Sequence, residues 1–302
     1  MSGKNRRDFL KKSVAIGTGA TLLSTLTANA VPTNILSEDR IGVLVDTTVC
    51  VGCRNCEWAC KDAHKLQTDN LDSYENRKIL ETKRRPDHNA LTVVNEYPPG
   101  KNSNLPIDVK VQCMHCDHPA CVSACIVGAF SKKENGSVVW DTDMCIGCRY
   151  CMAACPFQIP AFEYDKAINP LIMKCDFCFD RTKDKKLPAC VGICPAEALT
   201  YGPRTELIKI ARNHIKRNPD RYVDHIFGEY EVGGTSWMYL ASKDFKELDF
   251  PDLGKNPTPG VSESIQHGIF AYFVPPVSLY ALLGGIMWIS KRRKELEEEE
   301  KI

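Results

Sequence analysis

Four cysteines crowd into the short run from Cys145 to Pro156, and this run limits the possible folds more than any other feature. Its pattern is C-x2-C-x2-C-x3-C-P, in which three thiols can hold one iron–sulfur cluster while the fourth serves a second cluster. Structural zinc and disulfides are the alternatives. Zinc sites usually come as separated C-x2-C pairs, and cysteines this close together cannot easily all form unstrained bridges. The run therefore favours a [4Fe–4S] cluster.

The same arrangement recurs along the chain. All 16 cysteines of the 302 residues lie between Cys50 and Cys194, in four groups of four that each end in C-x3-C. Such a repeat defines the architecture of the region. Because each fourth cysteine serves a partner cluster, the groups should pair. The second group should pair with the third, and the first and fourth groups, which lie on either side of them in the sequence, should pair with each other. The groups are Cys50, Cys53, Cys56 and Cys60; Cys113, Cys116, Cys121 and Cys125; Cys145, Cys148, Cys151 and Cys155; and Cys175, Cys178, Cys190 and Cys194.

The N-terminus has the three parts of a twin-arginine export signal. Arg6 and Arg7 precede a Phe-Leu pair, a weakly apolar run follows, and Ala28, Asn29 and Ala30 form an A-x-A cleavage site. This pattern predicts a signal over residues 1–30, with a chance basic amphipathic helix as the alternative. The twin-arginine route exports folded proteins, so it suits a chain whose clusters assemble in the reducing cytoplasm.

The C-terminal end carries a candidate membrane span. Residues 268–290 have no charged side chain, and as a helix they would be about 35 Å long, enough to cross a bilayer. A buried soluble helix is the alternative. Basic residues follow the run at once, whereas the flank before it carries only Lys255, so the C-terminal end should stay in the cytoplasm. Both ends thus predict an inner-membrane protein with its cluster domain in the periplasm.

The remaining segments predict an α+β fold. Strands are expected at 41–46, 91–97, 107–111, 198–201 and 237–241, a helix at 206–217, and a surface loop with some helix at 65–89. We expect a cluster domain over 41–202, a cover or docking segment over 203–248, a proline-rich linker over 249–267 and a charged tail over 291–302.

Little else in the chain indicates chemistry. The net charge of +1 gives no case for nucleic acid. The chain has no phosphate-binding glycine loop, nucleophile elbow or zinc helix, so we expect no active site of its own. His115 and His118 are expected to be surface or packing residues. Lys174, Arg149 and Arg54 lie beside cysteines and would raise cluster potentials if they pointed inward, but we expect solvated side chains.

On these four groups the chain resembles the four-cluster ferredoxin-like electron-transfer subunits of membrane-bound oxidoreductases, over roughly residues 41–202. The resemblance implies two ferredoxin-like double-cluster modules with four [4Fe–4S] clusters. Lys61 and Ile126 depart from it, because proline often follows the fourth cysteine. The implied ligand sets are Cys50, Cys53, Cys56 and Cys194; Cys175, Cys178, Cys190 and Cys60; Cys113, Cys116, Cys121 and Cys155; and Cys145, Cys148, Cys151 and Cys125.

The combination of an export signal and a final span looks like the iron–sulfur subunit of a hydrogenase-2-type complex. The implied role is to pass electrons from the small subunit of a [NiFe] hydrogenase to an integral membrane subunit that reduces quinone. The equivalent beta subunit of a molybdopterin oxidoreductase, of the formate dehydrogenase or reductase type, is the alternative. A zinc-rich structural module is a third class, which the cysteine repeat disfavours.

Overall fold

The computed structural model describes residues 40–100, 104–166, 170–260, 263 and 277–293. Its main sheet has three strands in the order β8–β1–β9. The central strand β1 (Ile41–Asp46) pairs antiparallel with β8 (Leu199–Pro203) and parallel with β9 (Trp237–Leu240). Because successive side chains of a strand point to opposite faces, the apolar run of β1 contributes to two separate clusters of buried side chains.

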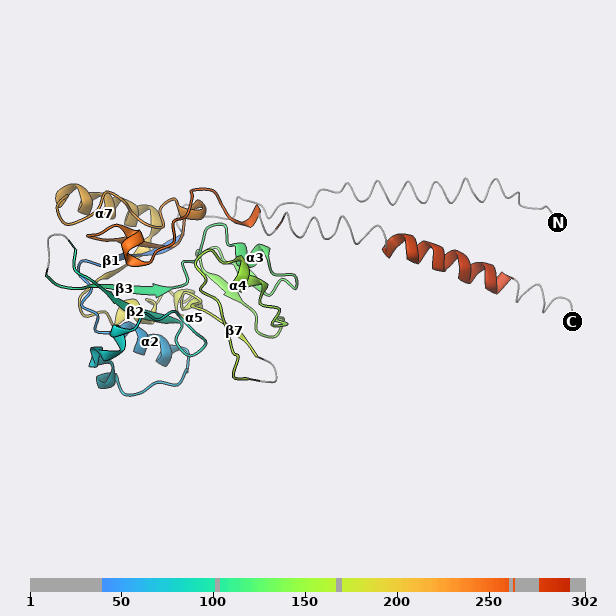
Figure 1. The fold of residues 1–302 in the computed structure, drawn as a ribbon, viewed down its shortest axis with the longest axis horizontal. Coiled ribbons are helices and arrows are strands. Elements are labelled where there is room, and N and C mark those ends of the chain that lie inside the picture. Colours follow the sequence, from blue (N-terminus) through green and yellow to red (C-terminus); the bar gives the residue numbers. More distant parts are fainter. Residues whose placement is uncertain (1–39, 101–103, 167–169, 261–262, 264–276, 294–302) are drawn as a thin grey trace, which may run out of the picture. The chain divides into compact units, whose positions relative to one another are not determined.

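Helix α7 (Arg204–Arg217) covers one face of this sheet (Figure 1). Leu207, Ala211 and Ile215 recur at four-residue intervals along α7, so they share one side of the helix. These three side chains are buried against Leu44 of β1 and Met238 of β9. The helix predicted at 206–217 is confirmed and begins two residues earlier.

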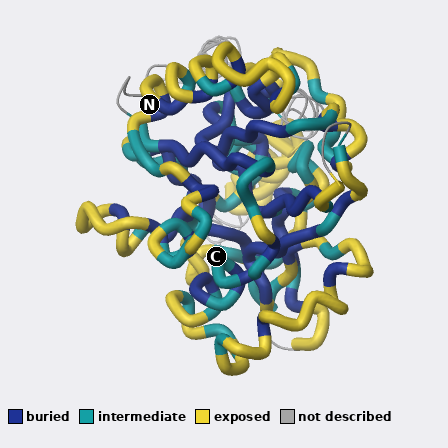
Figure 2. Tube along the Cα trace, turned by 90° about the vertical axis from the view of Figure 1, so that its left-hand side faces the viewer, coloured by how far each residue is buried: buried dark blue, intermediate teal, exposed yellow. Residues whose placement is uncertain are grey.

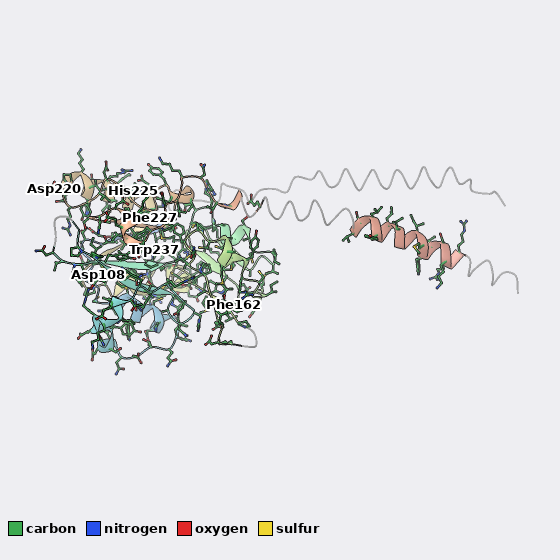
Figure 3. The ribbon with its side chains drawn as sticks, viewed as in Figure 1. Asp108, Phe162, Asp220, His225, Phe227 and Trp237 are labelled. Atoms are coloured by element: carbon green, nitrogen blue, oxygen red, sulfur yellow. The ribbon has the colours of Figure 1, made fainter. Side chains whose placement is uncertain are left out.

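The other face of the sheet carries a larger apolar cluster that faces the cysteine region. Trp237 is 1% exposed and lies among Val43, Val45 and Phe177, with Phe227 in the same cluster (Figure 3). Figure 2 shows buried stretches in the interior with exposed segments around them. The predicted strand at 237–241 is therefore part of the main sheet, and it brings segment 203–248 back onto the cysteine region.

Short hairpins and helices carry the cysteines. Helix α2 packs against α6, and α3 packs against α4, so the first cysteine group meets the fourth and the second meets the third. The hairpins are β2 (Thr92–Tyr97) with β3 (Ile107–Gln112), β4 (Phe130–Lys132) with β5 (Val138–Trp140), and β6 (Ala161–Phe162) with β7 (Ile172–Met173). The helices are α2 (Asn55–Ala63), α3 (Ala120–Ser123), α4 (Tyr150–Ala154), α5 (Phe179–Thr182) and α6 (Ala189–Gly192), with 3-10 turns η1 (Leu71–Glu75), η2 (Arg77–Glu81), η3 (Glu231–Gly233) and η4 (Phe245–Leu248).

The sequence predictions for the cysteine region agree with these elements. The strands expected at 41–46, 91–97, 107–111 and 198–201 are β1, β2, β3 and β8, with bounds that differ by at most a few residues. The loop expected at 65–89 contains η1 and η2 and no strand.

The two terminal segments are only partly described. The predicted export signal, residues 1–30, lies outside the described residues. Of the predicted span, residues 268–276 also lie outside them, whereas 277–290 belong to an exposed helix that continues to residue 293. Among the helices that the structure describes, none has both the length and the apolar character required to cross a membrane.

Candidate iron–sulfur centres

Each cysteine group opens with a loop whose third residue has a left-handed backbone. These residues are Gly52 (φ 63°), His115 (φ 50°), Gly147 (φ 67°) and Phe177 (φ 67°). Glycine adopts this conformation without steric cost. His115 and Phe177 are instead held by packing, since both are buried and their ring centroids lie 5.0 Å apart, edge to face. The fourfold repeat of the sequence is therefore also a repeat of backbone conformation.

The thiols of the first group lie close to the last cysteine of the cysteine region. Cys50, Cys53, Cys56 and Cys194 line one cavity. Burial raises the pKa of the Cys50 thiol to about 12, and the nearby charges of Cys194 and Cys53 act in the same direction. Cys50 follows β1 and Cys194 precedes β8, so the antiparallel pairing of these strands brings the two thiols together.

The thiols of the fourth group lie close to Cys60, the last cysteine of α2. Burial raises the pKa of Cys175 well above its usual value, and the charge of Cys60 is the largest contribution from another group. Burial also raises the pKa of Cys178 to about 12, with Cys190 and Cys60 adding to the shift. Cys60 thus lies among three thiols that follow it by more than a hundred residues.

The second and third groups exchange their last cysteines. Burial raises the pKa of Cys116, and the charge of Cys155 is the largest contribution from another thiol. Burial raises the pKa of Cys151 to about 12, and Cys125 is one of three thiols that add to the shift. The thiols that act on Cys116 are those of Cys155, Cys113 and Cys121, and those that act on Cys151 are those of Cys148, Cys145 and Cys125.

The donor chemistry of these sets fits iron–sulfur clusters. All sixteen cysteines lie within the described residues and are free of disulfides. A buried thiol with a raised pKa stays protonated at neutral pH, because a thiolate needs a compensating positive charge in a low-dielectric site. Bound iron would supply that charge, with the thiols deprotonated as ligands. Four thiolates are the usual ligand set of a [4Fe–4S] cluster.

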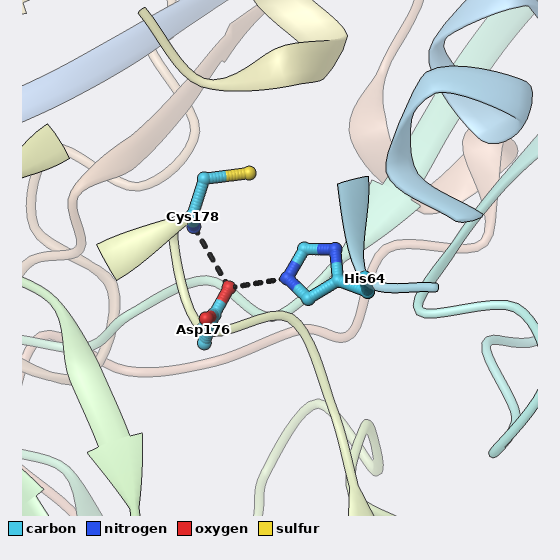
Figure 4. Close-up of side chains that lie close together, drawn as sticks. All are labelled: His64, Asp176 and Cys178. Atoms are coloured by element: carbon cyan, nitrogen blue, oxygen red, sulfur yellow. Dashed lines mark hydrogen bonds and ion pairs between the residues drawn. The ribbon is translucent and has the colours of Figure 1, made fainter. Parts of the chain in front are cut away.

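Beside the fourth group, His64 links two segments that are far apart in sequence (Figure 4). Its Nε2 lies 2.8 Å from Asp176 Oδ1, and its Nδ1 lies 2.8 Å from the carbonyl oxygen of Cys60. Burial works against the imidazolium, but the bonds to the Asp176 carboxylate and to the Cys60 thiol outweigh it and raise the pKa of His64 to about 11. His64, Asp176 and Cys178 lie close enough to hold a metal ion. Both ring nitrogens are already used, so the trio is better described as a support for the cysteine loops.

Solvated side chains are predicted for three basic residues beside the cysteines, and two of the three are buried instead. Lys174 is 1% exposed, and its Nζ donates to the carbonyl oxygens of Val138 (2.5 Å) and Cys175 (3.0 Å). Arg54 is also buried, and it donates to Glu57 and to the backbone carbonyls of Tyr74 and Asn76. The expected solvated side chain is therefore wrong for Lys174 and Arg54 and right for Arg149, which is exposed. His115 is a packing residue, as predicted.

Sequence reasoning missed two further lysines. Lys110, in β3, is 2% exposed. Lys132, in β4, donates to the carbonyl oxygens of His115 (3.1 Å), Cys116 (2.8 Å) and Gly136 (2.7 Å). Nothing in the local pattern could have located them, because alternating strands place lysine on the solvent side.

Comparison with known proteins gives one family match and three informative relatives. Residues 108–204 match the 4Fe-4S dicluster domain. The chain is 43% identical over 301 residues to a protein of Nitratidesulfovibrio vulgaris, covering 98% of this chain and 80% of the other. It is 32% identical over 326 residues to the hydrogenase-2 operon protein HybA of Escherichia coli O157:H7, covering 95% of each chain. It is also 31% identical over 237 residues to the iron–sulfur subunit of the nitrate-inducible formate dehydrogenase of Escherichia coli K12, covering 76% of this chain and 77% of that subunit.

The fold and the four thiol sets define a ferredoxin-like iron–sulfur protein that binds four [4Fe–4S] clusters. Within that class, the chain belongs to the family of HybA-like electron-transfer subunits, which also includes relatives that serve formate dehydrogenase.

Proposed function

We propose that this protein relays electrons between a [NiFe] hydrogenase and an integral membrane subunit that reduces quinone. The observation that supports this role most is the similarity to the hydrogenase-2 operon protein HybA, which extends over 95% of both chains. The clusters supply carriers that accept and release single electrons. The chain's own residues hold the thiols and exclude water from them, and we assign it no active site of its own.

The proposed ligands follow the neighbourhoods of the thiols. Each set takes three cysteines from one group and the last cysteine of the paired group, which the raised pKa values of the buried thiols support. The sets are Cys50, Cys53, Cys56 and Cys194; Cys175, Cys178, Cys190 and Cys60; Cys113, Cys116, Cys121 and Cys155; and Cys145, Cys148, Cys151 and Cys125.

The proposed location is the inner membrane, with the cluster domain in the periplasm. The twin-arginine pattern at residues 1–30 and the uncharged run at 268–290 support it. The described helix 277–293 adds support, because its apolar side chains from Val277 to Ile289 are exposed and require a partner or a bilayer to cover them. A protease added to spheroplasts should degrade the cluster domain, and complete protection would exclude the periplasm.

The catalytic partner is tested by metal analysis of the purified complex. The chain, tagged and extracted from membranes with detergent under anaerobic conditions, should co-purify with nickel and with hydrogen-dependent dye reduction. Relatives that serve formate dehydrogenase make a molybdopterin partner the second candidate. Stoichiometric molybdenum without nickel would refute the hydrogenase partner and favour the second candidate.

A further inference from the structure

One buried ammonium group lies between two of the four thiol sets. Lys110 of β3 is 2% exposed, and its Nζ donates to Thr92 Oγ1 at 2.7 Å and to Gln112 Oε1 at 2.9 Å. The Nζ atom also lies 4.6 Å from the centroid of the Trp237 ring. All three contacts are with neutral groups, so they orient the ammonium group without neutralising its charge.

Among the residues that the structure describes, no carboxylate lies beside Lys110 as a counter-ion. Within the described ranges of the chain, Lys110 forms no ion pair with Asp or Glu. A buried charge without an opposite charge is strongly unfavourable. The anions that compensate Lys110 must therefore come from the surrounding sulfur atoms.

Those sulfur atoms belong to two different sets. Lys110 lines the cavity formed by Cys50, Cys53, Cys56 and Cys194. Burial raises the pKa values of Cys56 and Cys190, and Lys110 is the strongest influence that lowers both. Conversely, the thiols of Cys190, Cys56 and Cys175 are the charged groups that act most strongly on Lys110.

One of the other two sets has buried cations of its own. Lys174 acts on Cys121, and Lys132 acts on Cys116, both from the set that also contains Cys113 and Cys155. Lys132 additionally has Asp117 at 3.9 Å. Lys110 is therefore the buried cation that the first and fourth groups share.

We propose that Lys110 is a positioning residue that supplies a fixed positive charge to two clusters, those held by Cys56 and by Cys190, and raises the reduction potential of both. When such a cluster is reduced it gains one electron from a one-electron donor, and no bond forms or breaks. The added negative charge is stabilised by a nearby cation, and a low-dielectric interior strengthens the effect. The inference rests on the ligand sets proposed above, and it does not depend on which complex the chain serves.

The test is a potentiometric EPR titration of the full chain carrying Lys110→Met, with dithionite as the reductant. We expect two of the four midpoint potentials to fall, so that at a fixed potential the reduced-to-oxidised ratio of those clusters falls about tenfold, or about 59 mV for a one-electron couple. The other two should keep their potentials, and the iron content should match the unmodified chain. The shifted signals should be those lost in Cys56→Ser and Cys190→Ser.

Two control variants separate charge from shape. Lys83→Met removes an exposed lysine that lines the same groove as Lys110, and it should leave all four potentials unchanged. Lys110→Arg keeps the charge and should keep both potentials near those of the unmodified chain. If the two midpoint potentials fell as far in Lys110→Arg as in Lys110→Met, the proposal would be overturned, because the shape of the side chain and not its charge would then set the potentials.

A third variant neutralises the ammonium group without removing it. Thr92→Asp places a carboxylate where the hydroxyl oxygen now accepts from Lys110. The same two potentials should fall, and this variant decides the matter if Lys110→Met does not retain iron. Unchanged potentials, or an equal fall in all four, would overturn the proposal. Loss of the hydrogenase partner in the purification would refute the proposed function and leave this result unaffected.

Discussion

Lysine is rare inside proteins unless it is paired, yet Lys110 and Lys174 are buried here at 2% and 1% exposure. Lys132 is also largely buried, with 12% of its side chain exposed. The charge of each of these lysines lowers the pKa of a cysteine thiol in one of the four sets. Clusters with thiolate ligands are anionic, so buried ammonium groups near them lower the cost of holding both kinds of charge away from water.

Single cysteines should have effects outside their own group. We predict that Cys155→Ser damages the cluster held mainly by Cys113, Cys116 and Cys121, because Cys155 lies among those thiols. Low-temperature EPR of the reduced protein should show that Cys155→Ser and Cys113→Ser lose the same signal. If Cys155→Ser instead removes the signal that vanishes in Cys145→Ser, the exchanged pairing is wrong.

His64 should stabilise the loop of the fourth group. We predict that His64→Leu releases iron faster and lowers the free energy of unfolding by about 1–3 kcal/mol, because Asp176 loses one of its two hydrogen-bond partners in a largely buried site and keeps only the backbone N–H of Cys178. Iron release into a chelator and denaturant unfolding under anaerobic conditions measure both effects. His225→Leu is the matched control, since it breaks another histidine–carboxylate pair, with Glu231, away from the cysteines. Equal iron release from both variants would contradict the role of His64.

Among the secondary-structure elements, α2 (Asn55–Ala63) connects two clusters. Cys56 and Cys60 are four residues apart, so they lie on the same side of the helix. Cys56 nevertheless lines the cavity of Cys50, Cys53 and Cys194, whereas Cys60 lies next to Cys175. One short helix therefore fixes the spacing between the two clusters of its module.

The C-terminal helix should matter for docking and not for cluster binding. We predict that deleting residues 268–302 releases the cluster domain in soluble form with its iron intact, because the deletion removes no cysteine. Hydrogen-dependent dye reduction should survive, whereas hydrogen-dependent quinone reduction should fall sharply. Both rates are measured in membranes and in the soluble fraction. Full quinone turnover by the truncated chain would show that the segment is dispensable for docking.

Across the whole molecule, the two ends of the cysteine region meet while its middle forms a module of its own. The pairing of β1 with β8 brings the first group to the fourth, and α3 packs against α4 between the second and third. We predict about sixteen iron atoms per chain, because four clusters of four irons are bound. Anaerobic iron and sulfide analysis checks this number. Eight or fewer irons, or stoichiometric zinc, would contradict it.

The spacing of the cysteines by itself determined the class of cofactor, the number of clusters and the pairing of the groups, because three closely spaced thiols can reach one cluster and the fourth another. Local pattern also located β1, β2, β3 and α7. The surroundings of the clusters were decided only by the tertiary structure. Lys110 alternates like a solvent-facing strand residue and is buried because other elements cover both faces of β3. His64 meets Asp176 across 112 residues of sequence, a contact that exists only because folding brings α2 against the loop of the fourth group.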